Sequence, residues 1–284
     1  MENNNQSQEW DLIIKGNTSL FDVRLKDVWH YRDLLFLFVK RDFVTVYKQT
    51  ILGPLWFFLQ PLLTTITFTV IFGSIAQLST DGAPKIIFYM AGITLWNYFS
   101  NCLTSVAGVF TTNASIFGKV YFPRLIMPLT IVISNLMKFG VQFLLFLCFL
   151  TYFVIKGQIH PNLYILIMPL IILLMALISM GIGLVLSAMT AKYKDLTQLI
   201  TFGVQLFMYV TPVIYPSSSI PVDYKWIVNL NPLVSLFDYM RFAYLGIGQF
   251  SVWSLVYPTL FSFAILALGI LVFNKSQKTF IDTV

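Results

Sequence analysis

Lys138 is an ionisable residue inside a long apolar stretch of the chain, residues 125–155. Ser134 stands four residues before it and Gln142 four residues after it, with Asn135 alongside, so these side chains share one side of a helix. A charged group at such depth in a membrane is costly and usually marks a transport path or a binding site. The alternative is structural, in which Lys138 reaches towards the interface or binds a backbone carbonyl.

Motifs for covalent or metal chemistry are missing from the sequence. The G-x-x-x-x-G-K-[ST] phosphate loop does not occur, so the chain is not expected to bind ATP by that route. His30 and His160 are far apart, and the apolar stretches hold no acidic pair, so neither a metal site nor a proton relay has support. Because no nucleophile stands with a base, we expect no catalytic residue and no cofactor on this chain.

The composition indicates a membrane protein. Of the 284 residues, 57% are hydrophobic and 11% are charged, whereas soluble domains carry about 25% charge. A helix needs roughly 20 apolar residues to cross the hydrocarbon core, and it satisfies its own backbone hydrogen bonds there. The sequence predicts an all-α polytopic membrane protein with six transmembrane helices, at about residues 52–78, 86–111, 125–155, 163–190, 196–215 and 252–273.

Positive charge is distributed unevenly between these stretches. With the N-terminus inside, 13 of the 18 lysines and arginines fall in cytoplasmic segments and four in outer segments. The positive-inside rule therefore predicts that both termini are cytoplasmic. The net charge of +6 reflects topology and lipid contact, because no basic cluster carries a recognisable nucleic-acid-binding fold.

Residues 27–48 are predicted to form one amphipathic helix that lies in the membrane interface, with Asp27 as N-cap. The alternative is a generic membrane anchor. Asp42 falls within the apolar face, so either the helix breaks near Arg41 or a cation pairs with Asp42. The charged face and the apolar face comprise, respectively, Asp33, Lys40, Arg41 and Lys48, and Val28, Tyr31, Leu35, Phe38, Val39 and Val46.

Gly53-Pro54 separates this amphipathic helix from the first apolar stretch. Pro54 has no backbone donor and disfavours helical geometry at Gly53, so the chain is expected to turn there from lying on the membrane to crossing it. We therefore divide the chain into a cytoplasmic N-terminal segment, residues 1–51, and a transmembrane domain, residues 52–284.

Two polar segments interrupt the apolar stretches. In residues 113–124, Asn113 is predicted to cap a short helix over 114–119, and the apolar side chains that follow either dock a partner or enter the lipid interface. In residues 216–251, Asn231-Pro232 predicts a helix start, and Gly246 and Gly248 predict its end. With 222–229 also helical, we expect two short helices that re-enter or cap the outer leaflet, or else a lid without a transport role.

The chain resembles the membrane subunits of type-2 ABC exporters, in particular the permeases that export O-antigen, capsule and teichoic-acid polysaccharides. The resemblance rests on YRDLL at 31–35, the R-D-x4-Y-K-Q-T-x-L-G-x-x-W-x-x-x-Q-P run at 41–61, FGKVYFPRLIMP at 117–128 and NPLVSLFDYMR at 231–241. It implies a homodimer in the inner membrane with two separate ATPase subunits, which bind ATP and magnesium. Their hydrolysis of ATP would move a lipid-linked glycan across the membrane.

The resemblance also implies roles for particular residues. Residues 113–124 would be the coupling helix in a groove of the ATPase, and the hairpin at 216–251 would gate the outer side. The arginines suit phosphate oxygens, and aromatic faces with amides suit sugars, although Trp56 is equally explained as part of an aromatic belt. The expected residues are, for coupling, Asn113, Ile116, Phe117, Lys119, Tyr121 and Arg124; for the entrance, Arg32, Arg41, Lys48, Gly53 and Pro54; for the substrate path, Trp56, Phe57, Gln60 and Lys138; and for the outer gate, Asn231, Pro232, Phe237 and Tyr244.

Two other functions are compatible with the sequence. The same fold with a closed apolar pocket would export a drug or a lipid, whereas a glycan needs a continuous, aromatic-lined path. A membrane scaffold without transport is the third possibility. Copurification with an ATPase would separate this scaffold from the two transporters.

Overall fold

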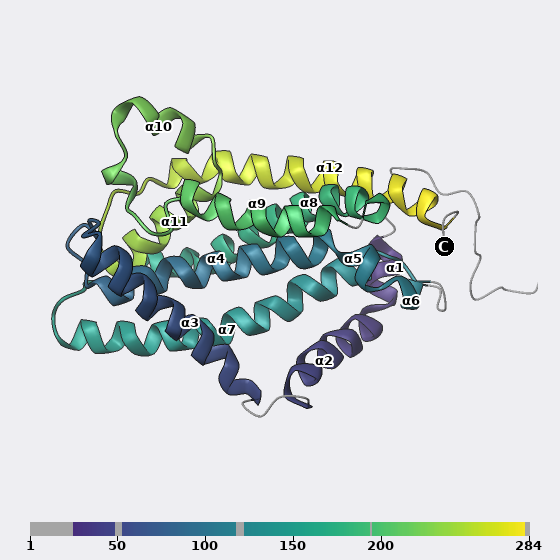
Figure 1. Cartoon of the computed structure of the whole chain (residues 1–284), viewed down its shortest axis with the longest axis horizontal. Coiled ribbons are helices and arrows are strands. Elements are labelled where there is room, and N and C mark those ends of the chain that lie inside the picture. Colours follow the sequence, from purple (N-terminus) through teal and green to yellow (C-terminus); the bar gives the residue numbers. More distant parts are fainter. Residues whose placement is uncertain (1–24, 49–52, 118–121, 194, 282–284) are drawn as a thin grey trace, which may run out of the picture.

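A computed structural model describes residues 25–48, 53–117, 122–193 and 195–281, and within them every regular element is a helix (Figure 1). Its helices and short 3₁₀ or π turns are α1 (Leu25–His30), α2 (Arg32–Lys48), η1 (Gly53–Leu55), α3 (Trp56–Phe68), η2 (Thr69–Ile75), α4 (Lys85–Ala107), α5 (Val109–Thr112), α6 (Ala114–Phe117), α7 (Ile126–Ile155), η3 (Leu163–Ile167), α8 (Met168–Lys192), α9 (Leu196–Val210), η4 (Ser217–Ser219), α10 (Val222–Asn229), α11 (Leu233–Met240), η5 (Arg241–Leu245), η6 (Val252–Leu255) and α12 (Val256–Ile281). The all-α prediction is confirmed.

Four helical segments are long and apolar enough to cross a membrane: Trp56–Ile75, Ile126–Ile155, Leu163–Lys192 and Val252–Ser276. They match four of the six predicted stretches. The other two stretches form α4, of 23 residues, and α9, of 15 residues. Polar residues lower the hydropathy of α4, and α9 is short, so the count of six spans is not confirmed although both helices run along the bundle (Figure 1).

Helix α4 forms the centre of the bundle and contacts α3, α7, α8 and α9. Its side chains Ile87, Phe88, Tyr89, Leu95 and Phe99 have no exposed surface. This burial surrounds much of α4 with neighbouring helices rather than lipid, although Asn101 and Ser105 remain exposed.

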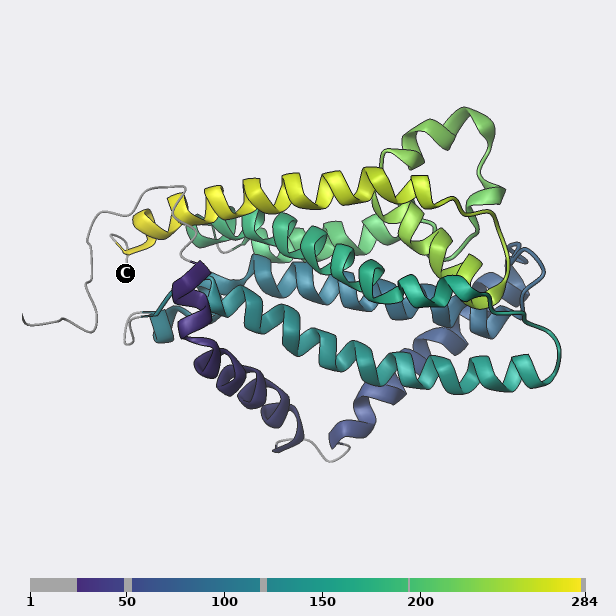
Figure 2. The ribbon, with the colours of Figure 1, turned by 180° about the vertical axis from the view of Figure 1, so that it is seen from behind.

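Helices α8 and α12 pack side by side along most of their length (Figure 2). The crossing uses two glycines: a Cβ on Gly269 would lie 2.5 Å from the carbonyl oxygen of Gly181, and a Cβ on Gly181 would lie 2.8 Å from the backbone of Ile265. Small residues at such crossings let two membrane helices approach closely and gain dispersion contacts.

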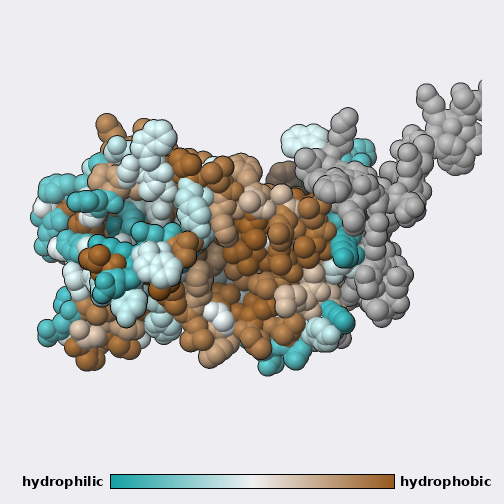
Figure 3. Space-filling view, turned by 90° about the horizontal axis from the view of Figure 1, so that it is seen from above, coloured by the Kyte–Doolittle hydropathy of each residue, from teal (hydrophilic) through white to brown (hydrophobic). Residues whose placement is uncertain are grey.

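Apolar side chains cover the middle of the molecule, and hydrophilic ones gather at the end that carries α10 and α11 (Figure 3). This pattern is the one a bilayer requires of a polytopic protein, since the lipid-facing surface must be apolar and the ends meet water.

The predicted helix over 27–48 is divided at Tyr31 into α1 and α2. The assignment of Asp27 as N-cap is wrong, because the helix already includes Leu25 and places Asp27 in its first turn. The two predicted faces of α2 exist, but its apolar face, with Leu35, Phe38 and Val39, is buried against the bundle and α7 rather than open to lipid.

Candidate functional site

A cavity of about 220 Å³ lies between α3, α4 and α7. The four residues predicted for the substrate path, which come from two different apolar stretches, meet in its wall. The full lining is Trp56, Phe57, Gln60, Asn101, Ser105, Asn135, Lys138 and Gln142. The wall therefore combines two aromatic rings, four amides, a hydroxyl and an ammonium group, and it holds no carboxylate.

Hydrogen bonds order the polar wall of this cavity. Lys138 Nζ donates to Asn135 Oδ1 at 3.3 Å, and Asn97 Nδ2 on α4 donates to Gln142 Oε1 on α7 at 3.3 Å. This hydrogen bond of Lys138 goes to a side chain rather than to a backbone carbonyl, which was one of the two forms of the structural alternative. Such an arrangement binds small polar groups and leaves the ammonium without a countercharge in the wall.

Asn101 and Ser105 line the cavity, although neither was predicted for the substrate path. A signal was present, because Asn97, Asn101 and Ser105 follow at four-residue intervals and so form one polar row along α4. The row faces the similar row of Asn135, Lys138 and Gln142 on α7, and the two rows meet through the Asn97–Gln142 hydrogen bond.

The chain changes direction between α2 and α3, as the Gly53-Pro54 interpretation expects (Figures 1 and 2). Gly53 has a positive φ of +48°, and a 3₁₀ turn over Gly53–Leu55 precedes α3. The two helices still touch, since the rings of Phe43 and Phe57 stack with centroids 6.1 Å apart. One side of Phe57 thus meets α2 while the residue also lines the cavity.

We expect Gly53→Ala to destabilise this turn by about 1–2 kcal/mol, because an L-residue with a Cβ is strained at positive φ. No atom lies within 4 Å of the position where the Cβ would stand, so the cost is conformational rather than steric. Gly53→Asn is the matched control, since asparagine tolerates this region better. Thermal unfolding in detergent measures the effect, and equal midpoints for the alanine and asparagine variants would contradict it.

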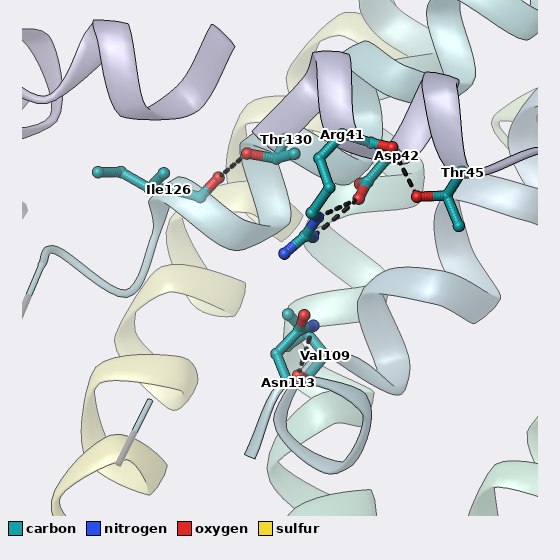
Figure 4. A network of polar contacts seen from close by, with 7 residues as sticks. All are labelled: Arg41, Asp42, Thr45, Val109, Asn113, Ile126 and Thr130. Carbon is teal, nitrogen blue, oxygen red and sulfur yellow. Dashed lines mark hydrogen bonds and ion pairs between the residues drawn. The ribbon is translucent and has the colours of Figure 1, made fainter. Parts of the chain in front are cut away.

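The predicted entrance cations differ in what they bind. Arg41 donates to Asp42 Oδ1 from Nε at 3.0 Å and from Nη2 at 2.8 Å, and Figure 4 shows the two groups turned towards each other. Asp42 is therefore paired, and α2 does not break at Arg41. Arg32 lies 3.9 Å from Asp33, and Lys48 is exposed at the end of α2.

The predicted coupling segment is more tightly packed than its sequence indicates. Phe117 packs with Phe110 and Phe122, at 5.9 Å between centroids in each case, and lies 5.5 Å from the guanidinium of Arg124. Phe122 is buried, and Ile116 and Phe117 are half-buried, so these three side chains do not form an open apolar surface. Lys119 and Tyr121 lie outside the described residues.

Asn113 does not cap α6 with its side chain. Its amide Nδ2 donates backwards to the carbonyl of Val109 at 3.1 Å, the first residue of α5, while its own carbonyl accepts from Ile116 and Phe117. The prediction is wrong because Asn113 is buried between two short helices, where its side chain joins its own backbone N–H on the carbonyl of Val109 (Figure 4). The described part of α6 ends at Phe117.

The outer hairpin contains the two predicted short helices, α10 and α11. Asn231 Oδ1 accepts from the backbone N–H of Leu233 at 3.0 Å, so Asn231-Pro232 starts α11 as expected, and Gly246, with φ of +69°, ends the following π turn. Phe237 is buried with α11. Tyr244 is buried too and packs edge-on against Phe143 and Phe146 of α7.

Arg241, the first residue of η5, is only 3% exposed although its side chain is charged. Its Nη2 donates to the carbonyl of Val213 at 3.0 Å, and its guanidinium lies 4.3 Å from the ring centroid of Phe88 on α4. Burial lowers the pKa of Arg241 to about 10, against the attraction of Asp238 and Asp81. Arg241 thus ties the hairpin to the bundle, a role that the local spacing does not indicate.

Comparison of the sequence with known protein families identifies the family of this chain. Residues 33–245, from α2 to the end of η5, match the model of the ABC-2 type transporter. The chain belongs to the ABC-2 type transporter family. The match includes the turn between α2 and α3, the cavity, the segment predicted to couple to an ATPase, and helices α10 and α11.

Relatives of this ABC-2 family member carry names that concern polysaccharides. An O-antigen export system permease protein of Klebsiella pneumoniae is 28% identical over 252 residues, which cover 88% of this chain and 94% of the relative. A namesake from Myxococcus xanthus is 27% identical over 75% of this chain and 80% of its own length. The polysialic acid transport protein of Escherichia coli is 22% identical over 86% of this chain and 93% of its own length.

Proposed function

We propose that this protein is the membrane-spanning permease subunit of an ATP-driven exporter that moves a lipid-linked polysaccharide across the bacterial inner membrane. It works as a homodimer with two copies of an ATPase subunit, which hold ATP and magnesium. Both termini face the cytoplasm, and the chain itself is not an enzyme. The observation that carries the proposal is the similarity to O-antigen export permeases over 94% of the length of one of them.

The cavity supports a polar cargo over a lipophilic one. Its wall holds amides, a hydroxyl and an ammonium beside Trp56 and Phe57, whereas a site for an apolar drug is lined mainly by hydrophobic groups. We assign the turn between α2 and α3 to the substrate entrance and α6 to the ATPase contact. Phe237 and Tyr244 give the outer hairpin a packed anchor rather than a flexible tether.

Export is tested by deleting the gene in its host and measuring surface polysaccharide and the lipid-linked precursor. We expect the polysaccharide to disappear from the surface and its precursor to accumulate inside, with restoration by the wild-type gene. Copurification of the tagged protein with an ABC ATPase checks the partner. Normal surface polysaccharide together with altered drug or lipid export would favour the second function, and absence of any ATPase would favour a scaffold.

A further inference from the structure

Lys138 is a cation without a counterion in the cavity. Its described hydrogen bond goes to the neutral amide oxygen of Asn135, which leaves two of the three ammonium donors available. Within the described residues no carboxylate lies within 4.0 Å of Nζ. A half-buried ammonium at this depth in a membrane span is costly without a countercharge, so the site as it stands favours the entry of an anion.

Asp42 is the carboxylate that acts electrostatically on Lys138, but it does not neutralise the ammonium. Asp42 on α2 attracts Lys138 electrostatically, but its Oδ1 already accepts two hydrogen bonds from Arg41 at 2.8 Å and 3.0 Å. Because Arg41 neutralises Asp42, the three groups together carry one net positive charge. This pairing also makes Arg41 a weaker candidate than Lys138 for holding an anionic ligand.

The rest of the cavity wall suits an oxyanion. Amide N–H groups of Gln60, Asn101 and Gln142, with the hydroxyl of Ser105, are available as donors around the ammonium. Asn135 is 5% exposed and holds Lys138 in place. At about 30 Å³ per water molecule, the 220 Å³ of the cavity corresponds to roughly seven waters, enough for a hydrated phosphate group.

We propose that this cavity is a binding site for a phosphate group attached to a lipid, with Lys138 as its charged ligand and the surrounding amides as its hydrogen-bond donors. A neutral sugar would satisfy the amides but would leave the ammonium uncompensated. The inference rests on the proposed function for the identity of the lipid, which would be the anchor of the exported glycan. A bulk phospholipid offers the same chemistry, and the experiment separates the two sources.

The position of Phe57 connects this site to the turn between α2 and α3. Phe57 lines the cavity and stacks on Phe43 of α2, so a ligand that fills the cavity meets the contact between α2 and α3. The phosphate site therefore lies beside the joint at which the chain turns into the membrane.

The test measures binding to the purified full-length protein in phosphatidylcholine nanodiscs by native mass spectrometry and by titration. The probes are farnesyl diphosphate, farnesyl monophosphate and farnesol, which share one chain and differ in charge. We expect affinity to fall in that order. Lys138→Gln should weaken farnesyl diphosphate binding about tenfold to a hundredfold, the range of a charge-assisted hydrogen bond, and should abolish the preference over farnesol.

Matched variants separate the site from general charge effects. Lys138→Arg keeps the charge and is expected to bind within a few-fold of wild type, whereas Lys225→Gln removes an exposed lysine of the outer hairpin and should change nothing. Competition by added phosphatidylglycerol that disappears in Lys138→Gln would support the phosphate site with a phospholipid as its source. Equal diphosphate affinity in wild type and Lys138→Gln overturns the proposal. Neither ATP nor export enters the assay, so its failure leaves the proposed function standing.

Discussion

Gly269→Ala is expected to destabilise the folded protein and to lower its yield from the membrane. The added methyl would lie 2.5 Å from the carbonyl oxygen of Gly181 and 3.1 Å from Cβ of Leu184, both on α8. Backbone oxygen cannot move aside, so α12 must shift away from α8 and lose contacts along the helix pair. Overpacking of this kind costs about 1–3 kcal/mol, and Gly269→Leu should cost more.

The control for this prediction is Gly140→Ala in α7, where no atom lies within 4 Å of the added Cβ. Because alanine is the better helix former, Gly140→Ala should be neutral or should raise the free energy of unfolding by up to about 1 kcal/mol. The measurement is the yield of monodisperse protein by size-exclusion chromatography, together with its thermal midpoint in detergent. The close-approach argument is refuted if the Gly269 and Gly140 variants behave alike.

Ser115→Arg is expected to detach the ATPase while leaving this chain folded. Ser115 is exposed on α6, whereas Phe117 beside it is half-buried among Phe110 and Phe122. A bulky charge at Ser115 therefore blocks a docking groove without disturbing the internal packing. We expect at least about tenfold less copurified ATPase, since burying an unpaired charge at an interface costs more than 1.4 kcal/mol.

Two controls accompany this experiment. Ser251→Arg makes the same change at an exposed position of the outer loop and should copurify with the ATPase as wild type does. Phe117→Glu should lower both stability and export, because it places a carboxylate in the ring cluster. Wild-type amounts of ATPase on Ser115→Arg would show that α6 is not the docking segment.

Local features of the structure could be read from the sequence because neighbouring residues decide them. Apolar stretches near 20 residues predicted the long helices, and Gly53-Pro54 predicted a change of direction that the backbone contains. Asn231-Pro232 and Gly246 marked the ends of an outer helix through capping chemistry. The spacing of Lys138 and Gln142 predicted one polar face, which a helical period alone is enough to define.

Tertiary structure alone decided what each face meets, since periodicity gives the direction of a side chain and not its neighbour. It brought Gln60 of α3 and Asn101 of α4 to the cavity of Lys138. It buried Arg241 against Phe88 of α4. These outcomes depend on close helix crossings, such as that of Gly181 with Gly269, whose partners are far apart in sequence.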